Sequence, residues 1–205
     1  KVKLQQLYQQ IVSSDFPEWV VSYKLSDFIG QINGLFISNS MSIRMMQMVA
    51  KPVNFSGHLN ICTNRGTSGI DGNLATSFGF AKQLKGPTVI LIGDLALLHD
   101  SNSLTLLEKV SQPILIICVN NNGGRIFDHL AIKKYPDKLE KYFQLPHSHS
   151  FKCLASFSKI AYQKVSTISA YEKVLNSFFD RPHHTLLEVL IDDNDKGLEF
   201  LKKID

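Results

Sequence analysis

Cysteine is scarce in this 205-residue chain, and the three that occur include no CxxC pair. An odd number of cysteines without that spacing argues against a disulfide framework. Cys118 lies within an apolar run, which is typical of a buried free thiol. The cysteine content therefore favours a protein of the reducing cytoplasm, and we expect a cytoplasmic location.

Long apolar runs and runs of one charge are also absent. The longest apolar run, near residues 113–119, is too short to span a bilayer. The formal net charge is +4 and no long Lys/Arg run accompanies it, which gives a nucleic-acid partner little support. No signal peptide, internal repeat or low-complexity stretch is visible. We therefore expect no membrane span and no nucleic-acid partner, whereas a basic cleft for anionic ligands stays possible.

The sequence does contain a regular alternation of apolar strands and amphipathic helices. The expected strands cover residues 35–38, 58–62, 88–92, 113–119 and 185–191. The expected helices cover residues 1–12, 25–32, 40–50, 71–84, 104–110, 151–161 and 170–179, with another from about 195. Fully apolar strands between helices predict an α/β domain, with a mainly parallel β-sheet and helices on both faces. We expect this domain to cover residues 25–205. Residues 13–24, around Pro17, are expected to be a connector, which makes residues 1–24 the tail of a preceding linker or helix.

Two polar clusters follow consecutive strands of the expected sheet. Gly93-Asp94-Leu95 comes directly after residues 88–92, and residues 120–124, Asn-Asn-Asn-Gly-Gly, come directly after residues 113–119. The interval between them accommodates one helix and a return strand, so both clusters should lie at the same edge. In parallel sheets this edge, beyond the carboxyl ends of the strands, is where ligands bind.

These clusters carry the oxygen ligands that a hard divalent cation prefers. Asp94 would supply a charge, Asn121 a neutral amide oxygen, and Gly123 a backbone carbonyl. Mg²⁺ takes six oxygens and commonly shares them with phosphates, while neighbouring backbone N–H groups can hold phosphate oxygens. The alternative is that these residues serve only as turn formers after strands.

The pattern resembles the binding motif for thiamine diphosphate (ThDP), which is Gly-Asp-Gly, about two dozen residues, and then Asn-Asn. Leu95 stands where the general motif has its second glycine. Further residues are similar to the MenD family, the 2-succinyl-5-enolpyruvyl-6-hydroxy-3-cyclohexene-1-carboxylate (SEPHCHC) synthases, in which Gly-Asp-Leu is usual. They are Ser38-Asn39-Ser40 with Arg44, the block from Asn64 to Gly72, Asp100 after Gly93-Asp94-Leu95, and Ile126-Phe127 after Gly124. The resemblance covers the chain from about Leu25 onward.

The resemblance implies a C-terminal, diphosphate-binding domain of such an enzyme. It implies Mg²⁺, or Mn²⁺ in its place, held by Asp94, Asn121 and the Gly123 carbonyl. ThDP contacts are implied for Ile70, Gly93, Asp94, Leu95, Asn121, Gly123 and Gly124, and substrate contacts for Ser40, Arg44, Arg65, Ile126 and Phe127. Ile70 would be the apolar wedge that bends ThDP. The two arginines would bind carboxylates, since a guanidinium fork matches a carboxylate bidentately.

Less specific interpretations of these side chains remain open. Ile70, Ile126 and Phe127 could be plain core residues, and the arginines could be solvated surface groups. Ser40 could be a helix N-cap. The histidines are expected to lie in loops or at the surface. Arg125 and His99 have no assigned role.

The reaction implied is the ThDP-dependent decarboxylation of 2-oxoglutarate and addition of the succinyl carbanion to isochorismate, which forms SEPHCHC for menaquinone biosynthesis. The resemblance places the activating glutamate in an N-terminal domain that this chain lacks, together with a middle domain. We therefore expect no catalytic residue in this chain, no activity of the chain alone, and a homo-oligomer for the intact protein. One alternative is another ThDP enzyme, such as a 2-oxo-acid decarboxylase or an acetolactate-synthase-like member. The other is a non-catalytic nucleotide-binding module, although no GxGxxG follows the first strand.

Overall fold

In the part of the chain that the structure describes, the fold is built on six parallel strands in one sheet. The computed structural model describes residues 2–9, 16–51, 59–64 and 69–191. The strand order is β2-β1-β3-β4-β6-β5. The strands are β1 (Gly34–Ile37), β2 (Asn60–Thr63), β3 (Thr88–Gly93), β4 (Ile114–Asn120), β5 (Ala161–Val165) and β6 (Thr185–Leu190). Every pairing is parallel, which confirms the expected α/β class.

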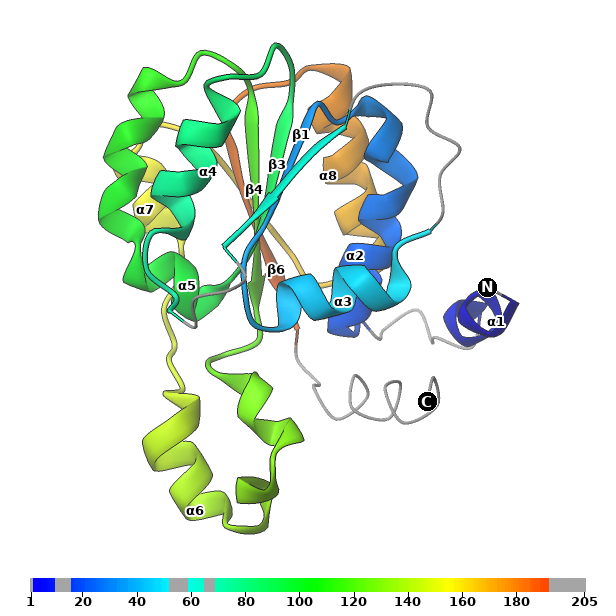
Figure 1. The fold of residues 1–205 in the computed structure, drawn as a ribbon, viewed down its shortest axis with the longest axis vertical. Helices are drawn as coiled ribbons and strands as arrows, with labels where there is room; N and C mark the ends of the chain where they lie inside the picture. Colours follow the sequence, from blue (N-terminus) through cyan, green and yellow to red (C-terminus); the bar gives the residue numbers. More distant parts are fainter. Residues whose placement is uncertain (1, 10–15, 52–58, 65–68, 192–205) are drawn as a thin grey trace.

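Helices cover both faces of this sheet (Figure 1). One face carries α2 (Glu18–Leu25), α3 (Met41–Val49) and α8 (Ile168–Asp180). The other carries α4 (Asn73–Ala81), α5 (Asp94–His99), the 3₁₀ segment η2 (Ser101–Lys109) and α7 (Lys152–Phe157). The remaining described helical elements are α1 (Val2–Gln9), η1 (Ser26–Gln31), η3 (Arg125–His129), η4 (Ala131–Lys134), α6 (Pro136–Leu139) and η5 (Glu140–Gln144).

Alternation along the central strands divides the core into two layers. In β4, Leu115, Ile117 and Val119 pack with α2, α3 and α8, whereas Ile116 and Cys118 pack with α4, η2 and α7. Successive strand side chains point to opposite faces, so a strand buried on both faces must be apolar at every position. This requirement explains the uninterrupted apolar run from which β4 was predicted. It also buries Cys118 as the expected free thiol.

The expected connector over residues 13–24 is wrong for its described part. Pro17 precedes the helix α2, which begins at Glu18, and the predicted boundary between residues 24 and 25 falls inside that helix. Trp19, Val20 and Val21 are buried in the core of the sheet domain. Pro17 signalled a break in the chain, but a proline is also tolerated at a helix start, and here it stands directly before one.

The expected helix over residues 151–161 is also too long. Helix α7 ends at Phe157, and Ala161 begins the edge strand β5, which the sequence analysis missed. β5 is half exposed and contains Gln163 and Lys164, so it lacks the apolar run of the central strands. The predicted helix from about residue 195 lies outside the described residues, as does the start of the strand predicted at 58–62.

Asp100 caps helix α4 from a distant point in the chain. The residue before α4 is Gly72, which has a left-handed φ of 69° and no side chain to accept a hydrogen bond. Asp100 Oδ2 instead accepts from the backbone N of Leu74 at 2.6 Å and of Ala75 at 3.2 Å. The first N–H groups of a helix have no intrahelical acceptor, so this buried carboxylate satisfies two of them.

Asp100→Ala is therefore expected to lower the free energy of unfolding by about 1–3 kcal/mol, because buried donors lose their acceptor. Urea unfolding followed by circular dichroism measures the change. Asp137→Ala, at an exposed position of α6, is the matched control and should change stability by less than about 0.5 kcal/mol. Equal effects of the two substitutions would contradict the capping role.

A search of the described residues found no helix with the length and apolar character needed to span a bilayer.

Candidate functional site

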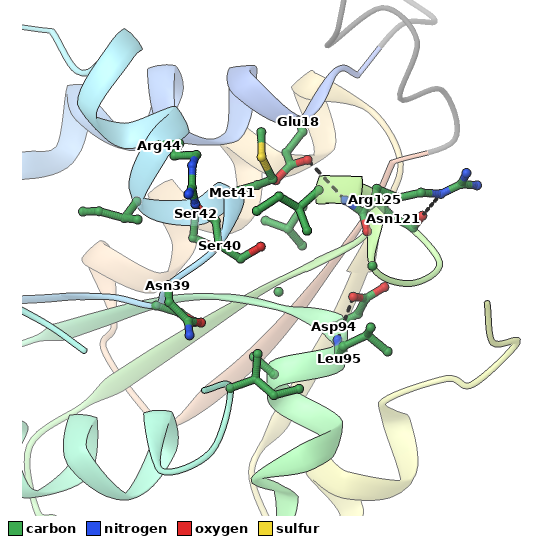
Figure 2. A pocket seen from close by; sticks show the side chains of 18 of the residues that line it. Glu18, Asn39, Ser40, Met41, Ser42, Arg44, Asp94, Leu95, Asn121 and Arg125 are labelled. Atoms are coloured by element: carbon green, nitrogen blue, oxygen red, sulfur yellow. Dashed lines mark hydrogen bonds between the residues drawn. The ribbon is translucent and has the colours of Figure 1, made fainter. Parts of the chain in front are cut away.

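A cavity lies at the edge of the sheet where the strand order changes direction. From β1, the chain adds β2 on one side and β3 on the other. The crevice outside the strand ends at such a switch point is the usual ligand site of open α/β sheets. Here it holds a cavity of about 1150 Å³, lined by residues that follow β1, β3 and β4 (Figure 2).

Most of the site residues expected from the sequence come together in this cavity. Its lining includes the expected cofactor residues Ile70, Gly93, Asp94, Leu95, Asn121, Gly123 and Gly124 and the expected substrate residues Ser40, Arg44, Ile126 and Phe127. The two strand-end clusters are neighbours because β3 and β4 pair in parallel, with Gly93 opposite Val119. Arg65 lies outside the described residues, so its expected substrate contact stays a prediction.

Asp94 is the buried carboxylate at the base of the cavity. It is the first residue of α5, and only 3% of it is exposed. Its Oδ1 accepts from Leu95 N at 2.7 Å, and its Oδ2 accepts from Gly123 N at 2.8 Å. Burial raises the pKa of Asp94, while these two backbone hydrogen bonds oppose that rise. A cation at this carboxylate would favour its charged form further.

The loop after β4 brings backbone groups to the same point. Asn122 and Gly123 have positive φ angles of 63° and 120°. A Cβ at Gly123 would lie 2.4 Å from the Gln144 carbonyl oxygen, so both the φ angle and the space require glycine. The Gly123 carbonyl accepts from Arg125 N at 2.9 Å, and Gly124 N donates to the Gln144 carbonyl at 2.5 Å.

Glu18 is a site residue that the sequence analysis missed. It lines the cavity and is 8% exposed, and its Oε2 accepts from Asn121 Nδ2 at 3.2 Å. Figure 2 shows the Asn121 side chain between Glu18 and Asp94. Burial raises the pKa of Glu18 to about 7, and the negative charge of Asp94 adds to this rise, while the hydrogen bond from Asn121 opposes it.

This shift makes the stability of the fold depend on pH. The Glu18 carboxyl has an ordinary pKa of 4.5 and a folded pKa of about 7, so the folded chain binds the proton more tightly. Its contribution to stability is therefore complete below 4.5, falls as the pH rises, and is lost above about 7. The change is on the order of 3 kcal/mol.

Glu18→Gln should abolish this part of the pH dependence, because an amide does not ionise. We expect the free energy of unfolding to fall between about pH 5 and about pH 8 more steeply for the wild type than for the variant. Urea unfolding of both proteins at the two pH values measures the difference. Parallel pH profiles would show that Glu18 does not titrate in this range.

His147 is a second residue at the site that was not predicted from the sequence, which indicated only a loop or surface position for it. It does lie in a loop, but its Nε2 is 3.1 Å from Asp94 Oδ2, and its side chain is 6% exposed. The same loop is fixed by His147 N, which donates to Asn122 Oδ1 at 2.9 Å. An imidazole therefore contacts the carboxylate expected to bind the cation. No spacing pattern could have indicated this contact, because it depends on how the loop folds back.

A buried glutamate anchors the strand end next to Asn121. Glu188 on β6 is fully buried, and its Oε1 accepts from Asn120 Nδ2 at 2.8 Å. Its Oε2 accepts from the backbone N of Phe151 at 3.2 Å, which ties the end of the His147 loop to the sheet. Burial and the hydrogen bond to Glu188 raise the pKa of Tyr162 to about 12, so this phenol stays a hydrogen-bond donor.

The loop after β1 forms the opposite wall of the cavity. Ser40 is the N-cap residue of α3, as expected, but its side chain makes no capping hydrogen bond. Its φ of 64° and ψ of −129° are unusual for a residue with a side chain, and such backbone strain is concentrated at functional sites. Arg44 Nη1 donates to the Ser40 carbonyl at 2.6 Å, which holds this guanidinium at the cavity wall.

The apolar lining residues also contact side chains or backbone outside the cavity. Ile70 is half-buried and packs partly against the α4 face, and its carbonyl accepts from Asn73 Nδ2 at 2.9 Å. Ile126 packs partly against the core of the α2 face. The ring of Phe127 lies edge-on to that of Phe143, with centroids 5.3 Å apart. Ile70 and Ile126 therefore both line the cavity and pack against the core, whereas the ring partner of Phe127 is the exposed Phe143.

Arg125, which has no role predicted from the sequence, lines the cavity. Its Nε donates to the Asn121 carbonyl at 3.2 Å, and its Nη1 lies 3.6 Å from Asp128 Oδ2. These contacts tie Arg125 to the loop after β4.

The residues at the cavity base fit a diphosphate-bound divalent cation. Asp94 offers a carboxylate, and the Asn121 amide uses its nitrogen toward Glu18, so its oxygen is the end that remains for a cation. Within the described part of the chain, no group of three or more His, Cys, Asp or Glu side chains could hold a metal. The expected site needs only one carboxylate, however, because Mg²⁺ is commonly bound by one or two carboxylates and by substrate phosphates.

Comparisons with known proteins show which proteins the chain is similar to. No family model matches the chain. It is 39% identical over 181 residues to the SEPHCHC synthase of Aeromonas salmonicida, which covers 86% of this chain and 31% of the relative. It is 44% identical over 149 residues to the synthase of Chlorobium phaeobacteroides, covering 72% and 26%. The chain thus spans between about a quarter and a third of the length of these curated relatives.

A solved structure shares the fold. A putative thiamin diphosphate-dependent enzyme from Mycobacterium smegmatis superposes with a TM-score of 0.62 at 16% identity, over 89% of this chain and 35% of that one. The fold therefore belongs to the α/β class seen in that enzyme. Over the matched residues the sequence is 39% and 44% identical to these two SEPHCHC synthases, which confirms the resemblance to that family.

Proposed function

We propose that this chain is the C-terminal, ThDP-diphosphate- and Mg²⁺-binding domain of a SEPHCHC synthase. The intact enzyme would decarboxylate 2-oxoglutarate and add the resulting succinyl group to isochorismate, in menaquinone biosynthesis. The observation that carries the proposal is the convergence of Asp94, Asn121 and Gly123 at one cavity base, in a chain similar to these synthases.

Each group at the cavity base has a distinct task in this proposal. Asp94, the Asn121 amide oxygen and the Gly123 carbonyl would hold Mg²⁺, or Mn²⁺ in its place, against the diphosphate. The backbone N–H groups at the start of α5 would approach phosphate oxygens, since helix starts favour anions. Ile70 would support the bent cofactor through its apolar side chain. When bound, ThDP supplies the electron sink for loss of CO₂.

The remaining residues expected at the site would bind the substrates. Arg44 and Arg65 are proposed to pair with carboxylates, which both substrates carry, and Ser40 would cooperate with Arg44. Ile126 and Phe127 would wall the pocket against water. Arg44 is already oriented by the Ser40 carbonyl, so little side-chain freedom would be lost on binding.

The rest of the enzyme would supply the remaining groups. The relatives are about three to four times as long as the matched segment, and the activating glutamate is proposed to come from an N-terminal domain. We further propose that the intact protein is a cytoplasmic homo-oligomer and that this chain alone is inactive. Turnover by the isolated chain would contradict the last point.

The full-length protein that contains this chain provides the direct test. With ThDP and Mg²⁺ present, CO₂ release is measured from 2-oxoglutarate and from pyruvate, each with and without isochorismate. Release from 2-oxoglutarate that depends on isochorismate is expected. Release from pyruvate instead would retain the ThDP site and assign the protein to the acetolactate-synthase-like or decarboxylase class. Nucleotide binding with no need for a divalent cation would favour a non-catalytic module.

A further inference from the structure

Glu18 is held in place by the core of the domain rather than by the cavity. It begins α2, whose next residues Trp19, Val20 and Val21 are buried. The Val21 carbonyl accepts from the Tyr171 hydroxyl at 3.1 Å, which joins α2 to α8. The glutamate therefore projects into the cavity from a fixed helix end, although 103 positions separate it from Asn121.

A carboxyl in this place is costly for folding. It is 8% exposed and lies close enough to Asp94 for the two groups to repel each other when both are charged. An apolar side chain would fill the same volume without that cost, and replacing buried charged groups by apolar ones is often neutral or stabilising. The hydrogen bond to Asn121 is the contact that an apolar residue could not reproduce.

That bond distinguishes the two ends of the Asn121 amide. The oxygen and nitrogen ends have nearly the same shape, so sterics alone do not select between them. A carboxyl oxygen of Glu18 accepts a hydrogen bond from the NH₂ end, so the amide oxygen of Asn121 points away from Glu18. With the opposite orientation, an NH₂ group would face a cation.

We infer that Glu18 is a positioning residue that fixes the Asn121 amide with its oxygen toward the divalent cation. The inference rests on the proposed function, since it assumes that a cation binds at Asp94 and Asn121. Groups that orient metal ligands typically contribute 10- to 100-fold to metal affinity, so roughly that loss is expected when the acceptor is removed.

The test compares Glu18→Gln with Glu18→Met in the full-length protein. The two replacements are close in length and volume, but only glutamine keeps a carbonyl oxygen that can accept from Asn121 Nδ2. Mn²⁺ binding in the presence of ThDP is measured by electron paramagnetic resonance, which requires no turnover. We expect Glu18→Gln to bind Mn²⁺ within about threefold of the wild type and Glu18→Met to bind it at least about tenfold more weakly.

Two further measurements separate orientation from general damage to the fold. Thermal unfolding identifies any variant that does not fold. If Glu18→Met does not fold, Glu18→Asp takes its place, because the aspartate side chain is one methylene shorter and holds its carboxyl oxygens farther from Asn121 Nδ2. In an Asn121→Ala background, Glu18→Met should cause no further loss of Mn²⁺ affinity, because Glu18 acts through Asn121.

The possible failures can be told apart. A wild-type protein that does not bind Mn²⁺ with ThDP would defeat the proposed function itself. A wild type that binds Mn²⁺, together with a folded Glu18→Met or Glu18→Asp variant of equal affinity, would overturn only the role of Glu18. Equal losses in Glu18→Gln and Glu18→Met, or additive losses in the double variant, would also overturn it.

Discussion

Asp94→Asn in the full-length protein is expected to weaken Mn²⁺ binding in the presence of ThDP by more than about 100-fold. Loss of a group that only supports a metal ligand costs about 10- to 100-fold, and the carboxylate that carries the charge should cost more. CO₂ release from 2-oxoglutarate should fall in parallel. Electron paramagnetic resonance of Mn²⁺ and a CO₂ assay measure the two effects.

The expected change in stability is much smaller than the change in binding. The Asp94 carboxylate accepts hydrogen bonds from both Leu95 N and Gly123 N. An asparagine would keep one oxygen for Leu95 N but would turn an NH₂ group toward Gly123 N, which would then lose its acceptor. One unsatisfied buried donor costs about 1–3 kcal/mol. Burial raises the pKa of Asp94, so removal of its charge offsets part of this loss.

Asp100→Asn is the matched control for this substitution. Asp100 is also buried and also accepts backbone N–H groups, but it does not line the cavity. It should change stability by a comparable amount and leave Mn²⁺ affinity within about threefold of the wild type. If both variants lost Mn²⁺ affinity equally, Asp94 would be a structural residue of α5 rather than a cation ligand.

Contacts at the cavity base follow from the order of the strands along the chain. Asp94 and Asn121 were expected to meet because consecutive parallel strands place their carboxyl ends at one edge. That rule needs only strand order, which apolar runs reveal. The Ser40 and Arg44 side of the cavity followed from the family resemblance, and the structure places both residues in the lining.

Glu18 and His147 could not be found in the same way. They reach Asn121 and Asp94 across 103 and 53 positions, from a helix start and from a loop. No periodic pattern in the sequence predicts the partner of either residue. The proline before Glu18 indicated a break, and only the burial of α2 shows that this segment belongs to the domain. Packing of whole elements, rather than spacing, determines these contacts.

Gly123→Ala is expected to lower the free energy of unfolding by about 3 kcal/mol or more. The glycine has a φ of 120°, which L side chains rarely adopt, and an added Cβ would lie 2.4 Å from the Gln144 carbonyl oxygen. Backbone strain of this kind costs about 1–3 kcal/mol, and overpacking against fixed backbone costs a similar amount. Since Gly123 N also donates to Asp94, movement of this loop should weaken Mn²⁺ binding as well.

Gly79→Ala tests whether this effect is specific to the turn. Gly79 lies in α4, and a Cβ there meets no atom within 4 Å. Alanine is the better helix former, so Gly79→Ala should stabilise the protein by about 0.5–1 kcal/mol. Urea unfolding of the two variants and Mn²⁺ titration with ThDP give both readouts. If Gly123→Ala unfolded like the wild type and bound Mn²⁺ normally, the loop after β4 could adopt another path, and the Gly123 carbonyl would no longer be fixed at the cavity base as a cation ligand.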